Sequence, residues 1–291
     1  MFKGSMVALV TPFKNGKIDE KGLCNLVKFQ IENGTDVICP CGSTGESATL
    51  SFEEHHRVVD IVIKAVDGKV PVLAGTGSNN TEEAILLTKY AKEAGAAGSL
   101  LITPYYNRPS QEGLYIHFKK IAEEVDIPIV LYNVPGRTGV NLLPETIEKL
   151  STISNIVGIK EATGSLAQAS EIVSRCGMNF DVISGDDVNA LPIMAIGGKG
   201  VISVTANIAP KEVASMVHAF EDGRIDEARK LHYKLFSLNS AMFLQTNPIP
   251  VKTALGMMGK ISSEMRLPLC PMPDELNEKL RNVLKTYKLI V

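Results

Sequence analysis

The chain has 291 residues, of which 45% are hydrophobic and 21% are charged, and its formal net charge is −2. This composition is ordinary for a globular protein with a large core, and a near-neutral chain without a basic stripe argues against a nucleic-acid partner. No run of 18 or more apolar residues is present, which argues against a membrane span, and the N-terminus lacks a signal-peptide layout, so we expect the cytoplasm as the compartment.

Eight short runs rich in β-branched residues recur along the chain, each followed by a loop and a helical stretch. The runs are roughly 25 to 30 residues apart, which suits repeated strand–helix units, and they are mostly continuous and apolar, as in parallel strands covered on both faces. In chain order the predicted strands are Val7–Thr11, Val37–Cys41, Val70–Gly75, Ser99–Pro104, Ile127–Asn133, Ile156–Glu161, Phe180–Ser184 and Gly200–Thr205.

The segments between these strands carry recognisable helix signals. An amphipathic stretch after the first strand stops near Gly34. Ser51 and Glu54 have the spacing of a capping box. Pro144 and Pro210 stand where helices should begin, which is the helical position that proline prefers.

After the eighth unit we predict three more helices, at Ile225–Gln245, Pro248–Met258 and Asp274–Tyr287. Eight such units with a helical tail favour a closed (β/α)8 barrel of the TIM type with a C-terminal helical extension. An open doubly wound sheet is disfavoured, because no Gly-x-Gly-x-x-Gly follows the first strand. We therefore predict a catalytic barrel over residues 1–224 and a helical region packed on it over residues 225–291.

Lys160 is the first candidate for chemistry, because reacting groups in such barrels lie at the C-terminal ends of strands. It lies near the end of the apolar run Ile156–Glu161. Removal from water penalises the ammonium form, and a neutral amine attacks a ketone to give an imine. The alternative is a lysine that reaches the barrel mouth or pairs with a buried acid; we prefer the catalytic interpretation because buried lysines are rare.

Tyr132 ends the fifth predicted strand, which neighbours the strand of Lys160. Adjacent strands lie about 4.8 Å apart, so its phenol is within reach to transfer protons near the imine. Position alone is equally consistent with a core tyrosine whose hydroxyl is hydrogen-bonded.

Polar loops follow three of the strands. The loop Gly42–Ser47 has two glycines whose backbone suits a carboxylate, although an ordinary turn with a helix cap explains it as well. Arg137 suits bidentate carboxylate binding, with a surface arginine as the alternative. Tyr105 and Tyr106 lie near the same rim, either for function or for packing against a partner subunit.

Neither metal nor cofactor chemistry is expected. All five histidines fall on predicted helices, and the adjacent Asp186 and Asp187 are more simply a cap that matches a helix dipole. The five cysteines are scattered, and Cys39 and Cys41 have neither an easy disulfide geometry nor the usual zinc spacing. We expect all five to be reduced thiols.

Four motifs, in order at successive predicted strand ends, resemble those of the dihydrodipicolinate synthase family, also called 4-hydroxy-tetrahydrodipicolinate synthase, among the pyruvate-dependent class I (Schiff-base) aldolases. The resemblance covers essentially the whole chain. The motifs are Gly-Ser-Thr-Gly-Glu (42–46), Pro-Tyr-Tyr-Asn (104–107), Tyr-Asn-Val-Pro-Gly-Arg-Thr-Gly (132–139) and Gly-Ile-Lys-Glu-Ala (158–162).

This resemblance implies a Schiff base between Lys160 and pyruvate, condensation with aspartate 4-semialdehyde, and a product used in lysine and diaminopimelate synthesis. It also implies a homotetramer built as a dimer of dimers. The implied proton relay is Tyr132, Ser43 (threonine in many members) and, in a neighbouring subunit's site, Tyr106. The implied binding residues are Thr44 for the pyruvate carboxylate, Arg137 for the carboxylate of the aldehyde, and the backbones of Gly185 and Ile202 for the pyruvate pocket.

The departure from the family pattern that matters lies in a pocket for inhibitory lysine. Family members that lysine inhibits often carry a histidine where Phe52 stands here. Loss of a polar contact weakens a site built for a charged ligand, so we predict weak feedback inhibition. The other matching positions of this pocket are Ser47, Ala48, His55, Asn79, Glu83 and Tyr105.

Two alternatives belong to different classes. A related pyruvate aldolase, such as an N-acetylneuraminate lyase or a keto-deoxy-sugar-acid aldolase, would keep Lys160 and Tyr132, but the Gly-Arg-Thr-Gly pattern around Arg137 favours the synthase. A non-catalytic barrel that senses small carboxylates would be expected to lose the lysine or the tyrosine, and both are present.

Overall fold

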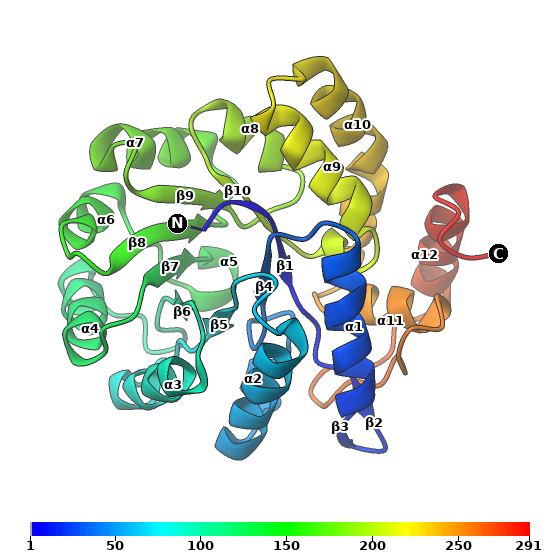
Figure 1. Ribbon diagram of the computed structural model, residues 1–291, viewed down its shortest axis with the longest axis horizontal. Coiled ribbons are helices and arrows are strands. Elements are labelled where there is room, and N and C mark those ends of the chain that lie inside the picture. The colour runs from blue at the N-terminus through cyan, green and yellow to red at the C-terminus, as the bar shows by residue number, and fades with distance from the viewer. Residues whose placement is uncertain (1) are drawn as a thin grey trace.

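The computed structural model describes residues 2–291, and its centre is a single parallel sheet of eight strands. Their order in the sheet is β4-β1-β10-β9-β8-β7-β6-β5. The two ends of this order meet through a parallel bridge between Ile38 and Val72 and a hydrogen bond from the Gly75 N–H to the Pro40 carbonyl (2.9 Å). The sheet therefore closes into a barrel with helices around it (Figure 1), and the predicted (β/α)8 fold is confirmed.

All eight predicted strands are present; β8 has its predicted bounds, and the other seven have shifted ends. The observed strands are β1 (Gly4–Ala8), β4 (Val37–Cys39), β5 (Leu73–Gly75), β6 (Gly98–Ile102), β7 (Ile129–Asn133), β8 (Ile156–Glu161), β9 (Asp181–Ser184) and β10 (Gly200–Ser203). β1 begins before the predicted Val7 because Gly4 pairs with Gly200, where a Cβ would lie only 2.0 Å from the Gly4 carbonyl oxygen. β4 ends before Cys41, whose φ of 57° takes the chain out of the strand.

In the described part of the chain, nine helices surround the barrel strands. They are α1 (Glu20–Glu32), α2 (Phe52–Val66), α3 (Thr81–Ala94), α4 (Gln111–Glu124), α5 (Pro135–Thr138), α6 (Pro144–Ser151), α7 (Leu166–Cys176), α8 (Ala190–Ala195) and α9 (Pro210–Glu221). The capping box of Ser51 and Glu54 is formed, and Pro144 and Pro210 open their helices as predicted. A short hairpin, β2 (Phe13–Lys14) with β3 (Lys17–Ile18), and two 3-10 turns, η1 (Ser47–Thr49) and η2 (Thr205–Asn207), were not predicted.

The C-terminal region forms α10 (Ile225–Ala241), α11 (Ile249–Met257) and α12 (Asp274–Thr286). The first ends four residues before the predicted Gln245, and the other two fall within a residue of their predicted bounds. Leu238, Leu255 and Leu280 from these three helices are fully buried, and they belong to the same apolar cluster as Val7 of β1. Within residues 2–291, no helix has the length and apolar character needed to cross a bilayer.

Side chains alternate between the barrel interior and the helix layer, as strand geometry requires. On β7, Val130 and Tyr132 join the interior cluster, while Leu131 packs outward among the helix side chains. On β8, Ile159 packs outward in the same layer. Lys160, the next residue, therefore points into the barrel.

Candidate active site

Lys160 lies inside the barrel against Tyr132. The two residues are register partners on β7 and β8, and the Lys160 Nζ is 4.2 Å from the centroid of the Tyr132 ring. The Lys160 side chain is 5% exposed. Only one other lysine of residues 2–291 is buried, Lys252, and it forms an ion pair with Glu46, whereas no carboxylate of this part of the chain pairs with Lys160. The predicted strand-end amine is thus buried without an acid partner.

Gly185, which follows β9, forms the wall beside the lysine side chain. A Cβ at this position would lie 3.1 Å from both Cγ and Cε of Lys160 and 2.6 Å from the Ala162 Cβ. The Gly185 N–H already donates to the Glu161 carbonyl (2.7 Å), which leaves its own carbonyl as the backbone group that it can offer to a ligand. Ile202, the other predicted wall residue, is buried in the interior cluster with Tyr132.

Cys39 faces the same interior. Burial raises the pKa of the Cys39 thiol to about 12, and the nearby Lys160 charge only partly opposes this rise. Cys39 therefore stays a neutral thiol at physiological pH and does not act as a counter-ion for the lysine. All five cysteines are free, and residues 2–291 contain no group of three or more His, Cys, Asp or Glu side chains placed to hold a metal ion.

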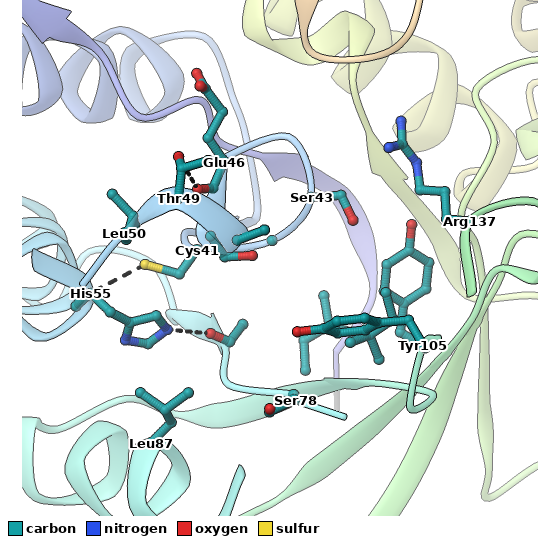
Figure 2. Close-up of a pocket in the computed structure, with 18 of the residues that line it drawn as sticks. Cys41, Ser43, Glu46, Thr49, Leu50, His55, Ser78, Leu87, Tyr105 and Arg137 are labelled. Atoms are coloured by element: carbon teal, nitrogen blue, oxygen red, sulfur yellow. Dashed lines mark hydrogen bonds between the residues drawn. The ribbon is translucent and has the colours of Figure 1, made fainter. Parts of the chain in front are cut away.

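A cavity of about 440 Å³ opens beside Tyr132. Figure 2 shows Ser43, Tyr105 and Arg137 grouped at one end of it and Leu50, His55 and Leu87 at the other. Ser43 comes from the loop after β4, Tyr132 from β7 and Arg137 from α5. The loop after β4, the strand β7 and the short helix after it therefore bring the predicted hydroxyl, phenol and guanidinium to one cavity.

Asn247 connects two of the predicted binding residues, although nothing in the sequence had marked it. Its carbonyl accepts a hydrogen bond from Arg137 Nη2 (2.9 Å), and its Nδ2 donates to the Thr44 hydroxyl (2.9 Å). Asn247 lies between α10 and α11, and its side chain is buried. The Asn-Pro-Ile-Pro run there indicates a break between two helices, but no local pattern predicts which residues of the barrel this segment contacts.

Four of the other predicted residues, Lys160, Thr44, Gly185 and Ile202, do not line this cavity. Tyr106 does not line it either. It is 90% exposed, and its φ of 71° is in the left-handed region that non-glycine residues seldom adopt. The cavity of the same chain is lined by Tyr105 and not by Tyr106. An aromatic side chain held outward in this way is available to a neighbouring molecule.

Five of the residues matched to a lysine pocket also line this cavity. Ser47, Ala48, His55, Glu83 and Tyr105 line it, together with Phe52. Asn79 instead donates a hydrogen bond to the Tyr105 carbonyl (3.2 Å). The aromatic ring of Phe52 supplies no hydrogen-bonding atom there, and weak inhibition by lysine stays a prediction that a rate assay with added L-lysine can check.

Asp187 does not cap a helix start as predicted, because α8 begins only at Ala190. Its carboxylate is buried and accepts hydrogen bonds from the Ser203 hydroxyl, the Val204 N–H (2.9 Å) and the Thr205 N–H (3.2 Å). Burial raises the pKa of Asp187, and these donors partly offset the rise. The Asp187 carboxylate thus links the segment after β9 to the end of β10 through hydrogen bonds.

The family model for the dihydrodipicolinate synthetase family matches residues 1–287. The 4-hydroxy-tetrahydrodipicolinate synthase of Geobacter sp. (strain M21) is 62% identical over 290 residues that cover 100% of both chains. A dihydrodipicolinate synthase from Acinetobacter baumannii, crystallised with pyruvate, is 47% identical, with a TM-score of 0.98 and full coverage of both chains. A monomeric dihydrodipicolinate synthase variant is 46% identical, with a TM-score of 0.97 over 99% of this chain and 98% of its own.

Proposed function

The chain belongs to the dihydrodipicolinate synthetase family, and from this premise we propose that it condenses pyruvate with aspartate 4-semialdehyde as a 4-hydroxy-tetrahydrodipicolinate synthase. The observation that carries the proposal is the Lys160 amine, which is buried without an acid partner and lies 4.2 Å from the ring of Tyr132, a residue that lines the cavity. The enzyme is a lyase of the class I aldolase type.

The first half of the reaction forms an imine. The neutral Lys160 amine attacks the pyruvate keto carbon, and loss of water from the adduct gives the Schiff base. The position of Lys160 supports this role, because its amine is buried beside the Tyr132 ring and no carboxylate of residues 2–291 pairs with it. The protonated imine then withdraws electrons, so the pyruvate methyl group loses a proton and becomes an enamine.

In the second half, the enamine carbon attacks the aldehyde carbon, and a carbon–carbon bond forms. The amine of the aldehyde substrate next attacks the imine carbon, which closes the ring and returns Lys160 as a free amine. The overall exchange releases one water molecule and needs no oxidant. We propose that the product serves lysine and diaminopimelate synthesis.

We assign proton transfer to the phenol of Tyr132 with the hydroxyls of Ser43 and Tyr106. Tyr132 is supported by its contact with Lys160 and Ser43 by its place on the cavity wall. Tyr106 is 90% exposed on its own chain, so we propose that it completes the site of a neighbouring subunit. A homotetramer built as a dimer of dimers fits this proposal.

We assign the carboxylate of pyruvate to Thr44, with the Gly185 carbonyl and the backbone of Ile202 lining the pocket, and the carboxylate of the aldehyde to Arg137. A guanidinium binds a carboxylate through two parallel hydrogen bonds. Arg137 is supported in this role because it lines the cavity, and the hydrogen bond from its Nη2 to the Asn247 carbonyl fixes the guanidinium there. The five free thiols fit the cytoplasm as the compartment.

Substrate choice is tested by comparing turnover with aspartate 4-semialdehyde against cleavage of N-acetylneuraminate. We expect the condensation to be faster, and we expect Arg137→Ala to raise the KM for the aldehyde far more than the KM for pyruvate while imine formation persists. Faster cleavage of the sugar acid would assign the chain to the related lyases instead.

A further inference from the structure

Lys252, the second buried lysine, lies against the loop Gly42–Ser47, which carries the hydroxyls of Ser43 and Thr44. Lys252 of α11 and Glu46 form an ion pair in which neither side chain has any exposed surface. The Lys252 Nζ also donates to the Thr11 carbonyl (2.9 Å) and lies 4.3 Å from the centroid of the Phe13 ring. The ammonium is therefore surrounded by partners on several sides.

The carboxylate of Glu46 is held just as completely. One oxygen accepts from Lys252, and the other accepts from the backbone N–H of Arg266 (3.1 Å). Replacement of a buried ion pair by apolar residues is often neutral or stabilising, so such a pair is a weak argument for stability. What a fully satisfied pair does supply is a fixed position for the backbone that carries it.

Glu46 lies near the C-terminal end of the loop Gly42–Ser47. Glu46 has a φ of 55°, a left-handed conformation that non-glycine residues seldom adopt. The Thr11 hydroxyl donates to the Gly45 carbonyl (2.7 Å), while the carbonyl of the same Thr11 accepts from Lys252. Thr11, Gly45, Glu46 and Lys252 thus form a closed ring of contacts directly after Ser43 and Thr44.

We infer that the Glu46–Lys252 pair is a positioning device for the pyruvate half of the reaction. It touches no substrate; it holds the loop so that Ser43 and Thr44 meet the keto acid. Arg137, assigned to the aldehyde, is held by the Asn247 carbonyl, and the same Asn247 donates to the Thr44 hydroxyl. The pair itself has no hydrogen bond to Arg137 or Asn247, so we infer that it acts directly on the pyruvate side and on the aldehyde side only through Asn247. This inference rests on the proposed function, because it assigns the loop to pyruvate.

The test is the double variant Glu46→Gln/Lys252→Met, which removes both charges together and leaves no unpaired charge buried. The amide oxygen of the introduced glutamine can still accept from the Arg266 N–H, and the methionine fills most of the lysine's volume. We expect the KM for pyruvate to rise about tenfold, equivalent to about 1.4 kcal/mol, and borohydride trapping of pyruvate to slow similarly. The KM for the aldehyde and the melting temperature should stay near those of the wild type.

The matched control is Glu275→Gln/Lys279→Met, which removes an ion pair of α12 whose side chains are 79% and 56% exposed. An unchanged KM for pyruvate in the buried double variant overturns the inference. An equal rise of both KM values also overturns it, because that result would mean a general loss of order in the site.

If the buried double variant does not fold, the single variant Glu46→Asp replaces it, because this change keeps both charges and shortens the acid by one carbon. Glu46→Asp should raise the KM for pyruvate, and an unchanged value overturns the inference. Absence of trapping at Lys160 in the wild type would instead defeat the proposed function.

Discussion

At the residue scale, the position of Lys160 could be predicted because a strand of six residues with one lysine near its end has few other interpretations. Its partner Tyr132 could be predicted from strand order. Asn247 could not be, because its two contacts join residues 110 and 203 positions away in the chain. Asp187 was wrongly interpreted for the same reason, since its partners lie on the next strand and not in its own helix.

Gly185 leads to a prediction at this scale. Gly185→Ala would place a Cβ 3.1 Å from Cγ and Cε of Lys160 and 2.6 Å from the Ala162 Cβ, and overpacking of this kind costs about 1 to 3 kcal/mol. We expect the Lys160 side chain to shift and the rate of imine formation to fall at least about tenfold. Borohydride trapping over time measures the rate.

The control for Gly185→Ala is Gly136→Ala, where a Cβ would meet nothing within 4 Å. The control should trap pyruvate at the wild-type rate. Unimpaired trapping by Gly185→Ala would mean that this wall of the site is not tight around the lysine.

At the level of helices and strands, the elements could be predicted from hydrophobic periodicity and capping residues, whereas their ends depended on tertiary contacts. β8 has its predicted bounds because both its faces are covered by apolar layers. β1 starts at Gly4 because of its pairing with Gly200, which no local hydrophobic pattern reveals. The hairpin β2–β3 was missed because two-residue strands have no periodicity to detect.

The contact between α3 and α4 predicts a pH dependence of stability. His117 of α4 is buried, its Nδ1 is 2.9 Å from the Thr81 hydroxyl, and its Nε2 has no partner among residues 2–291. Burial lowers the pKa of His117 to about 4, below the ordinary value of about 6.5. The unfolded chain therefore binds more protons than the folded chain between these values, and stability falls as the pH falls through this window.

His117→Gln removes this ionisation and keeps a hydrogen-bonding group toward Thr81. We expect the loss of unfolding free energy between about pH 7 and about pH 5 to shrink by on the order of 2 kcal/mol relative to the wild type. Urea unfolding at the two pH values measures it. An equal loss in both proteins would mean that His117 can take up a proton without disturbing the contact.

At the scale of the whole molecule, the C-terminal helices contribute to both core and site. Their leucines share one apolar cluster with the barrel, Asn247 contacts two predicted binding residues, and Lys252 contacts the loop after β4. The sequence predicted these helices but not their part in the site. We propose that residues 225–291 do not form an independent domain and that removal of them prevents the barrel of residues 1–224 from folding, which circular dichroism of the truncated chain would check.

The exposed Tyr106 predicts complementation between subunits. Lys160→Ala lacks the amine and Tyr106→Phe lacks the relayed hydroxyl, so each alone should be nearly inactive. In mixed assemblies, a site with Lys160 from one chain and Tyr106 from its neighbour is intact. We therefore expect co-expressed, differently tagged chains to be more active than either parent, whereas no gain would place Tyr106 in its own chain's site or outside any site.

We propose that one buried amine forms the Schiff base, and borohydride reduction in the presence of pyruvate traps that amine covalently. Peptide mass spectrometry should find a stable pyruvate adduct at Lys160 and at none of the other lysines, including the buried and paired Lys252. Lys160→Ala should give no adduct. An adduct on a different lysine, or none in the wild-type chain, would show that Lys160 does not form the Schiff base.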